Sequence, residues 1–509
     1  MIFHHTGSMD TYITNKIVNS SERATGANVG YASTIDIFKL YGESTLKGVA
    51  GVCTLSDGSQ RTDLSEVECN ALVGASFNAN LKELSRGLIY FDLDQLKTEI
   101  ENQVDVLNDT TLKIKLVLSD VQGTQVAPSN FTLELCPLNV SFEEGLGDNV
   151  VTFGDSYSAS WLSPSAGNTW TEPGGTSDIG GTIATQTFTT GLEDLEMDIT
   201  SFVQDYWTDS VATPNLGWML KFTDAVEDDI KTYFVKRFSS RHTRNPLLRP
   251  KIVATWESFL IDDHLDFYSS TNNTITIRNY SQGTGASTLN APKVTLSRGE
   301  WSKEAIGSEI TLGSITQTGH YSATINVDPF GVDSALATDL VASGSLLLQE
   351  RWTYEDNEDP ANEILLHSGS IDMKYPLASV SGLPRDYRFS ILDLKSTYVR
   401  TESPQVRLFI REKNLANEPV RIPIQLPSQM IRKAYFQVKD TNSYKILIPF
   451  SDRISSPDES TRISSDAHGM YFSFPASVLP RGRTYTIDIA YYDRGERRVW
   501  ESNMAFKVD

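Results

Sequence analysis

The stretches SRGLIYFDL (residues 85–93) and TLKIKLVL (residues 111–118) decide the fold of this 509-residue chain. In the second stretch Leu112, Ile114 and Leu116 alternate with polar residues, and this period of two predicts a half-buried β-strand. The stretches MDITSFVQDYW (residues 197–207) and NLGWMLKF (residues 215–222) have the same texture. We therefore expect the two pairs to be the outgoing and returning strands of one β-sandwich.

Further short strands extend the all-β prediction along the whole chain. Phe131, Leu133 and Leu135 alternate with polar neighbours until Pro137, and residues 252–256 resemble a closing strand. Residues 200–207 are the exception, because Phe202, Val203 and Tyr206 have helical spacing. After Trp256, runs of short strands separated by turn residues predict two further sandwiches. The predicted fold is all-β: a jelly-roll-like β-sandwich (residues 1–257) followed by two smaller immunoglobulin-like β-sandwich domains (residues 258–384 and 385–509).

Composition excludes several classes of protein. Asp and Glu number 65 against 44 Lys and Arg, for a net charge of −21, so a nucleic-acid partner is not expected. The sequence shows neither a secretory signal nor an apolar run long enough to span a membrane. Its three cysteines, Cys53, Cys69 and Cys136, predict buried free thiols in a reducing cytoplasm, with a Cys53–Cys69 bridge as the alternative.

The sequence contains no recognisable catalytic motif, and we expect no enzyme. None of the seven histidines falls in a metalloprotease-type pattern, and no nucleophile elbow or phosphate-binding loop follows a strand. Carboxylates are abundant, so a glycosidase pair is the enzymatic alternative, but no pattern singles out two of them. No cofactor and no catalytic metal are predicted. A structural calcium ion is the alternative to solvated acidic loops at Asp262, Asp263 and Asp266, at residues 224–229, and at Asp10.

Residues 231–251 carry seven basic residues without an acid between them, which is the sharpest charge contrast in this acidic chain. The functional hypothesis is a contact with an acidic neighbouring subunit. The candidate assembly contacts are Lys236, Arg237, Arg241, Arg244 and Arg249. Neutralisation by the acidic run at residues 224–229 is the plainer interpretation, and a nucleic-acid contact is the third.

Residues 143–191 are rich in Gly, Ser, Thr, Asn and Pro, which predicts long loops on the rim of the sandwich. Tyr157, Trp161 and Trp170 lie in these loops and are candidate glycan contacts. The alternative is that these aromatic residues pack beneath the loops as a satellite hydrophobic cluster.

The first half of the chain resembles the DNRLRE (disaggregatase-related) domain. The resemblance rests on DTYI (residues 10–13), RGLIYFDL (86–93), MDIT (197–200) with Val203 and Trp207, and NLGWML (215–220). It implies a jelly-roll sandwich of the kind found in carbohydrate-associated and surface proteins. The long insertion between Asp10 and Arg86, and the long loops at residues 143–191, depart from the pattern. No sugar-contacting residue can be carried over.

Residues 230–509 resemble virion structural proteins of tailed bacteriophages in composition and in several short stretches of sequence. The similar phrases are TYFVKRFSSRH (residues 232–242), FIREK (409–413) and LPRGRTY (479–485). The resemblance implies a structural component of the tail, neck or baseplate, made in the host cytoplasm and located in the virion. Its partners would be other virion structural proteins and further copies of itself. The alternative function is a carbohydrate-binding surface or receptor-recognition module.

Overall fold

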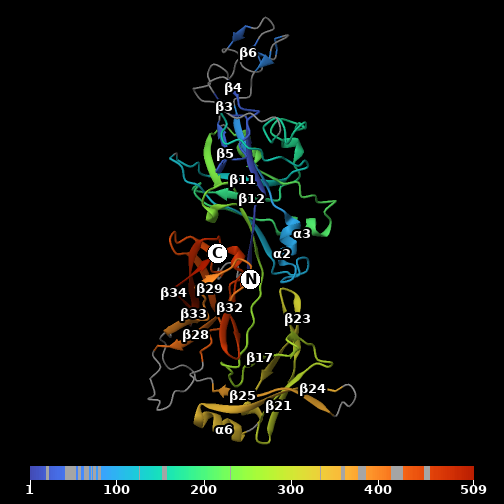
Figure 1. Cartoon of the computed structure of the whole chain (residues 1–509), viewed down its shortest axis with the longest axis vertical. Coiled ribbons are helices and arrows are strands. Elements are labelled where there is room, and N and C mark those ends of the chain that lie inside the picture. Colours follow the sequence, from blue (N-terminus) through green and yellow to red (C-terminus); the bar gives the residue numbers. More distant parts are fainter. Residues whose placement is uncertain are drawn as a thin grey trace. The chain divides into compact units, whose positions relative to one another are not determined.

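The computed structural model of the chain forms two compact units (Figure 1). The N-terminal unit comprises residues 4–99 and 113–254, and the C-terminal unit comprises residues 1–3, 100–112 and 255–509. The structure describes residues 1–18, 22–40, 53–54, 59–61, 68–69, 71–72, 76–77, 82–124, 126–151, 158–229, 231–332, 334–356, 362–375, 386–413, 428–451, 459–493 and 495–509. The predicted all-β sandwich fold is confirmed. No helix among these residues has the length and apolar character needed to cross a membrane.

Two sheets build the N-terminal unit. The seven-stranded sheet has the order β12-β11-β14-β9-β5-β15, with β2 also paired to β9, and the four-stranded sheet has the order β1-β16-β10-β13. The strands of the first sheet are β2 (Met9–Thr14), β5 (Thr34–Leu40), β9 (Glu83–Tyr90), β11 (Phe131–Pro137), β12 (Ala184–Phe188), β14 (Trp218–Phe222) and β15 (Tyr233–Ser239). Those of the second are β1 (Ile2–Thr6), β10 (Lys113–Leu118), β13 (Leu195–Asp198) and β16 (Lys251–Thr255).

The stretches that open the sequence analysis pair as predicted. Strand β9 runs antiparallel to β14, with Gly87 opposite Leu220. Strand β10 runs antiparallel to β13, with Lys115 opposite Asp198. Apolar residues of β10 are buried in alternation with its lysines, as the period of two requires. The outgoing and returning strands therefore lie side by side in both sheets.

One face of the seven-stranded sheet, here called the outer face, carries Leu88 of β9 and Met219 of β14. The loops between residues 138 and 179 cover this face and bring Phe142, Trp161 and Trp170 into one buried cluster with it. Because both faces of the sheet are covered, seven of the eight residues of β9 are buried. The loops predicted to stand on the rim therefore complete the core.

Helices α2 (Leu93–Ile100) and α3 (Thr200–Thr208) lie side by side (Figure 1). The indole Nε1 of Trp207 donates to the Leu93 carbonyl at 2.9 Å, and the Tyr206 hydroxyl donates to Asp94 at 3.0 Å. Helix α3 confirms the helix predicted for residues 200–207. A short helix, α4 (Asp224–Asp228), and the 3-10 helices η1 (Thr176–Asp178) and η2 (Pro246–Leu248) complete the unit.

The insertion between β5 and β9 contains a disulfide bond between Cys53 and Cys69. The prediction of three free thiols is therefore wrong, and Cys136 is the free, buried cysteine. Cys53 lies on β6 (Cys53–Thr54), which pairs with β7 (Gln60–Arg61) and β8 (Ser76–Phe77). Cys69 lies between β7 and β8 in the chain, so the bond fastens this part of the insertion to a small sheet that is separate from the seven-stranded one. Strands β3 (Ile17–Val18) and β4 (Glu22–Arg23) form another two-stranded sheet.

Residues 100–112 lie between two parts of the N-terminal unit in sequence, but they pack in the C-terminal unit. The amide of Asp105 donates to the Gly313 carbonyl at 2.7 Å, and the Ser314 hydroxyl donates to Asp109 at 3.0 Å. This excursion differs from the predicted division, which kept all residues to 257 together.

Residues 272–374 form the middle sandwich of the C-terminal unit. Its main sheets have the orders β17-β23-β22 and β21-β20-β24-β25, with β18 and β19 paired separately. Its strands are β17 (Asn272–Arg278), β18 (Tyr280–Ser281), β19 (Thr284–Gly285), β20 (Lys293–Arg298), β21 (Trp301–Ile306), β22 (Ser308–Leu312), β23 (Ile315–Asn326), β24 (Ser345–Glu355) and β25 (Glu363–Lys374). Helices α5 (Pro329–Val332) and α6 (Ser334–Ser343) join β23 to β24, and α6 contributes Leu336 and Leu340 to the core (Figure 1).

Residues 387–508 form the C-terminal sandwich, with sheets ordered β26-β28-β32-β31 and β27-β34-β33-β29-β30. Its strands are β26 (Tyr387–Leu392), β27 (Thr397–Tyr398), β28 (Gln405–Glu412), β29 (Ala434–Asp440), β30 (Ile446–Ile448), β31 (Ser464–Asp466), β32 (Gly469–Ser473), β33 (Arg483–Asp493) and β34 (Glu496–Val508), with η3 (Ala476–Val478) between β32 and β33. Stacked Phe436 and Phe472, whose ring centroids are 4.5 Å apart, join the two sheets across the core.

Candidate functional site

Lys236, the first of the predicted assembly contacts, lies inside the N-terminal unit. Its side chain extends from β15 and is 1% exposed. The ammonium group lies 2.5 Å from Asp120 and donates to the carbonyls of Gly191 (3.0 Å) and Glu193 (2.8 Å). These three acceptors use all three protons of the group. The prediction that Lys236 is a surface contact is therefore wrong, because its side chain holds two loops against the edge of the sheet.

The remaining arginines of the basic segment divide between paired and exposed positions. Arg237 pairs with Asp36 of the neighbouring strand β5 at 3.1 Å. Arg244 and Arg249 are exposed, and Arg249 reaches back to the carbonyl of Thr243 at 3.3 Å. Arg244 and Arg249 are thus the two candidate contacts that the fold leaves exposed.

Arg241 belongs to a compact polar cluster that ties β2 to the segment after β15. Its guanidinium binds both carboxylate oxygens of Glu144 at 2.5 Å, and its backbone amide donates to Asp10 at 2.6 Å. The backbone amide of Asp10 donates in turn to Glu144 at 3.0 Å. His242 Nε2 lies 3.3 Å from Glu144, and its ring packs on Tyr31 with centroids 4.5 Å apart.

The pKa of the Asp10 carboxyl in this cluster is strongly raised. Burial raises the pKa, the hydrogen bond from the Arg241 amide lowers it, and the charge of Glu144 raises it again, to about 7. A buried carboxyl with a raised pKa is one component of acid–base catalysis. Here, however, the bidentate Arg241 neutralises Glu144, and the cluster fastens three chain segments together.

Among the described residues, the ion pairs of the acidic run at residues 224–229 are formed outside the basic segment that follows it, contrary to the plainer interpretation. Its carboxylates pair instead with basic residues of the seven-stranded sheet and its borders: Asp224 with Lys221 at 2.7 Å, Glu227 with Arg86 at 2.6 Å, Asp228 with Lys82 at 2.8 Å, and Asp229 with Lys39 at 2.7 Å. Within the described ranges, no group of three or more His, Cys, Asp or Glu residues is arranged to hold a metal ion.

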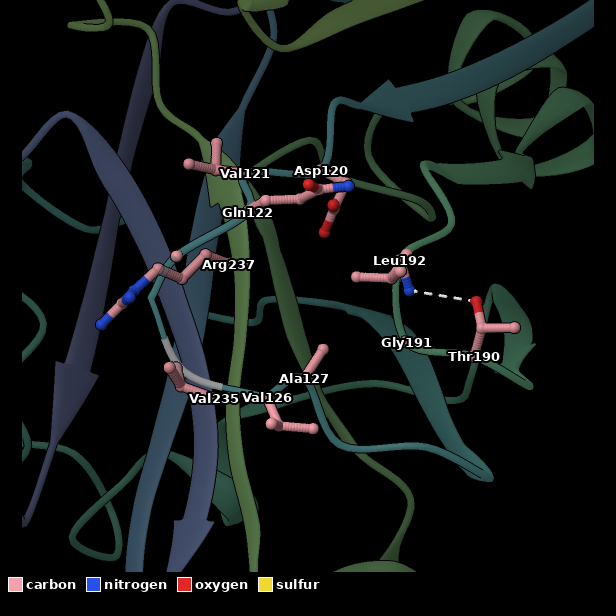
Figure 2. Close-up of a pocket in the computed structure, with 11 residues that line it drawn as sticks. Asp120, Val121, Gln122, Val126, Ala127, Thr190, Gly191, Leu192, Val235 and Arg237 are labelled. Atoms are coloured by element: carbon pink, nitrogen blue, oxygen red, sulfur yellow. Dashed lines mark hydrogen bonds between the residues drawn. The ribbon is translucent and has the colours of Figure 1, made fainter.

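A pocket of about 270 Å³ opens beside the edge strand β15 (Figure 2). Val235 and Arg237 of β15 form one wall, and the loops at residues 120–127 and 190–192 form the others. Val126 is 90% exposed and Leu192 51% exposed, so the mouth is apolar. The Leu192 amide donates to the Thr190 hydroxyl at 3.3 Å (Figure 2). Neither loop carries a sequence pattern that would have marked this pocket.

The predicted glycan contacts are not surface aromatics. Trp161 and Trp170 are 7% and 5% exposed and belong to the cluster on the outer face. Arg86 lies over the Trp161 ring at 5.1 Å, and Trp170 Nε1 donates to the Ser160 carbonyl at 2.9 Å. For both tryptophans, glycan contact is wrong and the packing alternative is confirmed. Tyr157 lies outside the described residues.

Glycine 174 explains how Arg86 and Trp161 come so close to the loop. Its φ is +91°, and a Cβ there would lie 2.5 Å from the Trp161 ring. The absent side chain lets the Gly174 carbonyl accept a hydrogen bond from Arg86 at 2.6 Å. Arg86 is thereby fixed between this carbonyl and Glu227.

No family model and no curated protein matches the chain. Among solved structures, a DUF4785 family protein from Legionella pneumophila is 10% identical, with 80% of this chain and 87% of that chain covered, at a TM-score of 0.15. The FN1–FN3 domains of chicken CNTN1 are 9% identical over 57% of this chain and 87% of that chain, and Salmonella alpha-2-macroglobulin is 8% identical over 100% and 28%, both again at 0.15. Scores this low support no functional conclusion.

Proposed function

We propose that the chain is a non-enzymatic structural component of a tailed bacteriophage particle that acts through protein–protein contacts. The observation that carries the proposal is the placement of residues 232–242, the sequence segment that resembles virion proteins. They form the edge strand β15 and the start of the loop that exposes Arg244 and Arg249. Residues 119–121 already pair with the outer edge of β15, because the Val121 amide donates to the Arg237 carbonyl at 3.0 Å. The exposed arginines that follow the strand suit contacts with neighbouring proteins and with copies of the chain in a symmetric assembly.

The Cys53–Cys69 bond constrains where the mature protein works. Disulfide bonds persist in oxidising surroundings and are rare in the cytosol. A virion protein is made in the host cytoplasm and meets an oxidising medium once the host cell lyses. The proposed virion location is therefore compatible with a bond that closes after release.

The sugar-binding alternative has lost two of the three residues that supported it. It depended on Tyr157, Trp161 and Trp170; both tryptophans lie under the loops, and Tyr157 lies outside the described residues. A glycan site would have to be built elsewhere, and we do not propose one.

The test is incorporation into purified particles of a phage that encodes the chain. The double variant Arg244→Glu, Arg249→Glu should fold, because both side chains are exposed, and should be incorporated at about a tenth of the wild-type level or less, because like charges oppose an acidic partner. Arg388→Glu, at an exposed position of β26, is the matched control and should assemble normally. Arg241 is unsuitable for this test because it holds Glu144.

Two results would overturn the proposal. One is the absence of the wild-type chain from the purified particles, as judged by mass spectrometry. The other is wild-type incorporation of the double variant, which would exclude the exposed arginines as the contact.

A further inference from the structure

The segment between the N-terminal and middle sandwiches runs along the C-terminal sandwich. The Leu260 carbonyl accepts from the Ser465 amide at 2.8 Å, and the Leu260 amide donates to the Ser464 hydroxyl at 3.1 Å. The Asp262 amide donates to the Ser465 hydroxyl at 2.9 Å. Ser464 and Ser465 belong to β31, the last strand of its sheet. The segment thus adds to an edge that would otherwise lack a partner.

Asp263 joins both sandwiches of the C-terminal unit. Its amide donates to the Thr274 carbonyl at 2.7 Å, and its Oδ2 accepts from the Thr274 amide at 2.8 Å, at the start of the middle sandwich. Its Oδ1 lies 3.0 Å from a guanidinium nitrogen of Arg432 in the C-terminal sandwich, an ion pair that is not an aligned hydrogen bond. Nearby, Arg462 lies over the Phe259 ring at 4.3 Å.

His264 fixes the same segment to the middle sandwich. Its Nδ1 lies 2.5 Å from Asp262, and its Nε2 lies 3.1 Å from Glu350 of β24. Both carboxylates are almost fully buried, at 1% and 3% exposed, and Glu350 also accepts from Trp352 Nε1 at 2.6 Å. Two buried carboxylates on opposite sides of one imidazole require its doubly protonated, cationic form.

We propose that residues 259–264, here called the clasp, hold the middle and C-terminal sandwiches together as one body, with His264 as the residue that positions the clasp. The bonds to Ser464, Ser465 and Arg432 face the C-terminal sandwich, and those to Glu350 and Thr274 face the middle one. The inference is independent of the proposed virion function.

The charges around His264 set the pH range in which the clasp is closed. Burial by itself lowers the pKa of His264, but the hydrogen bonds and charges of Asp262 and Glu350 outweigh it and raise the pKa to about 10. The stabilisation is thus fully present below the ordinary histidine value of 6.5 and is lost as pH rises toward 10.

Other titratable groups around the clasp are paired. His367 lies 4.0 Å from Glu350, Asp266 lies 3.5 Å from Lys374, and Asp263 faces Arg432. Burial raises the pKa of Asp263 and the charge of Arg432 opposes that rise. We therefore assign alkaline opening of the clasp to His264.

Hydrogen exchange on the full chain tests the clasp. The Ser465 amide should exchange about tenfold faster or more in Arg432→Ala, because its bond to Leu260 opens locally while the core strands β24 and β33 keep their protection. Arg432 is 49% exposed, so this variant should fold. Arg407→Ala is the matched control, because Arg407 pairs with Asp466 inside the C-terminal sandwich at 2.7 Å and should leave the Ser465 amide at its wild-type rate.

Two results would overturn the proposal. They are a wild-type exchange rate at Ser465 in Arg432→Ala, and acceleration that spreads equally to β24 and β33. A second arm compares wild type with His264→Gln between pH 7 and 10.5, after correction for intrinsic exchange. Protection of Ser465 should fall with pH in wild type and be low throughout in the variant, and an identical pH dependence in both would exclude His264.

Discussion

Strands β9 and β24 are both central strands of β-sandwiches, yet their burial differs. Seven of the eight residues of β9 are buried, whereas in β24 the buried Leu346 and Leu348 alternate with the exposed Leu347 and Gln349. The difference comes from the loops at residues 138–179, which cover the outer face in the N-terminal unit. Alternation in a sequence therefore reveals a strand with one covered face, and its absence shows where a second layer lies.

A second covered face also means that polar side chains must be buried. Arg86 and Lys221 extend from the seven-stranded sheet into its covered side, where Glu227 and Asp224 of helix α4 meet them. On β24 the outward Arg351 reaches solvent. Charges on the covered face therefore belong to the fold, while charges on an open face remain available for solubility or for partners.

The largest expected effect is the loss of the Arg86–Glu227 pair. Arg86→Met should lower the free energy of unfolding by about 3–5 kcal/mol, because Glu227 would stay buried without its cation. Arg351→Met, on the open face, should change it by less than about 0.5 kcal/mol. Urea unfolding followed by tryptophan fluorescence measures both, and equal effects would show that the two faces do not differ as described.

The second largest expected effect on stability is the loss of Trp161, which lies beneath the loops. Trp161→Ala should lower the free energy of unfolding by about 3 kcal/mol, because it removes part of the buried cluster on the outer face. Leu347→Ala, at a position 58% exposed on β24, is the control and should have little effect. If Trp161→Ala left stability unchanged, Trp161 would not be the packing residue described above.

Asp10 predicts a pH dependence confined to the N-terminal unit. Its pKa rises from 3.8 to about 7 on folding, so its contribution to stability is fullest below 3.8 and is lost as pH rises to 7. Asp10→Asn should remove this slope and be more stable than wild type at pH 8 by about 2 kcal/mol, since no buried carboxylate must ionise. Asp148→Asn, at an exposed loop position, should keep the wild-type slope. A slope that persists in Asp10→Asn would assign the titration to another group.

The smallest effect concerns the disulfide. Replacing Cys53 and Cys69 by serine should shift the free energy of unfolding of the sandwich by less than about 0.5 kcal/mol, because both cysteines lie in the insertion between β5 and β9, outside the two main sheets. The denatured wild-type chain should titrate as one thiol before reduction and as three afterwards. Three thiols without reductant would mean that the bond does not form.

The spacing of apolar residues predicted the strands and helices that depend on local sequence. The alternation of Leu112, Ile114 and Leu116 gave strand β10, and the spacing of Phe202 and Val203 gave helix α3. The fate of each charge could not be predicted this way. Lys236 and Arg244 look alike in sequence, yet one is buried because acceptors distant along the chain meet it, and the other is exposed.

The predictions for the cysteines and for the tryptophans were wrong for the same reason. Whether Cys53 reaches Cys69 depends on how an insertion folds back, which an odd cysteine count does not reveal. Whether Trp161 faces a sugar or the sheet depends on the path of a long loop, and Gly174, whose missing side chain makes room for it, gives no clear signal in a glycine-rich stretch.

The excursion of residues 100–112 makes the two units covalently interlaced. The backbone passes from one unit to the other between residues 3 and 4, 99 and 100, 112 and 113, and 254 and 255. A protease that cuts only between 254 and 255 would divide the chain into two polypeptides, and the first would still carry residues 1–3 and 100–112, which pack with the second. Expression of residues 1–257 alone would produce an N-terminal sandwich carrying a segment, residues 100–112, whose packing partners are missing.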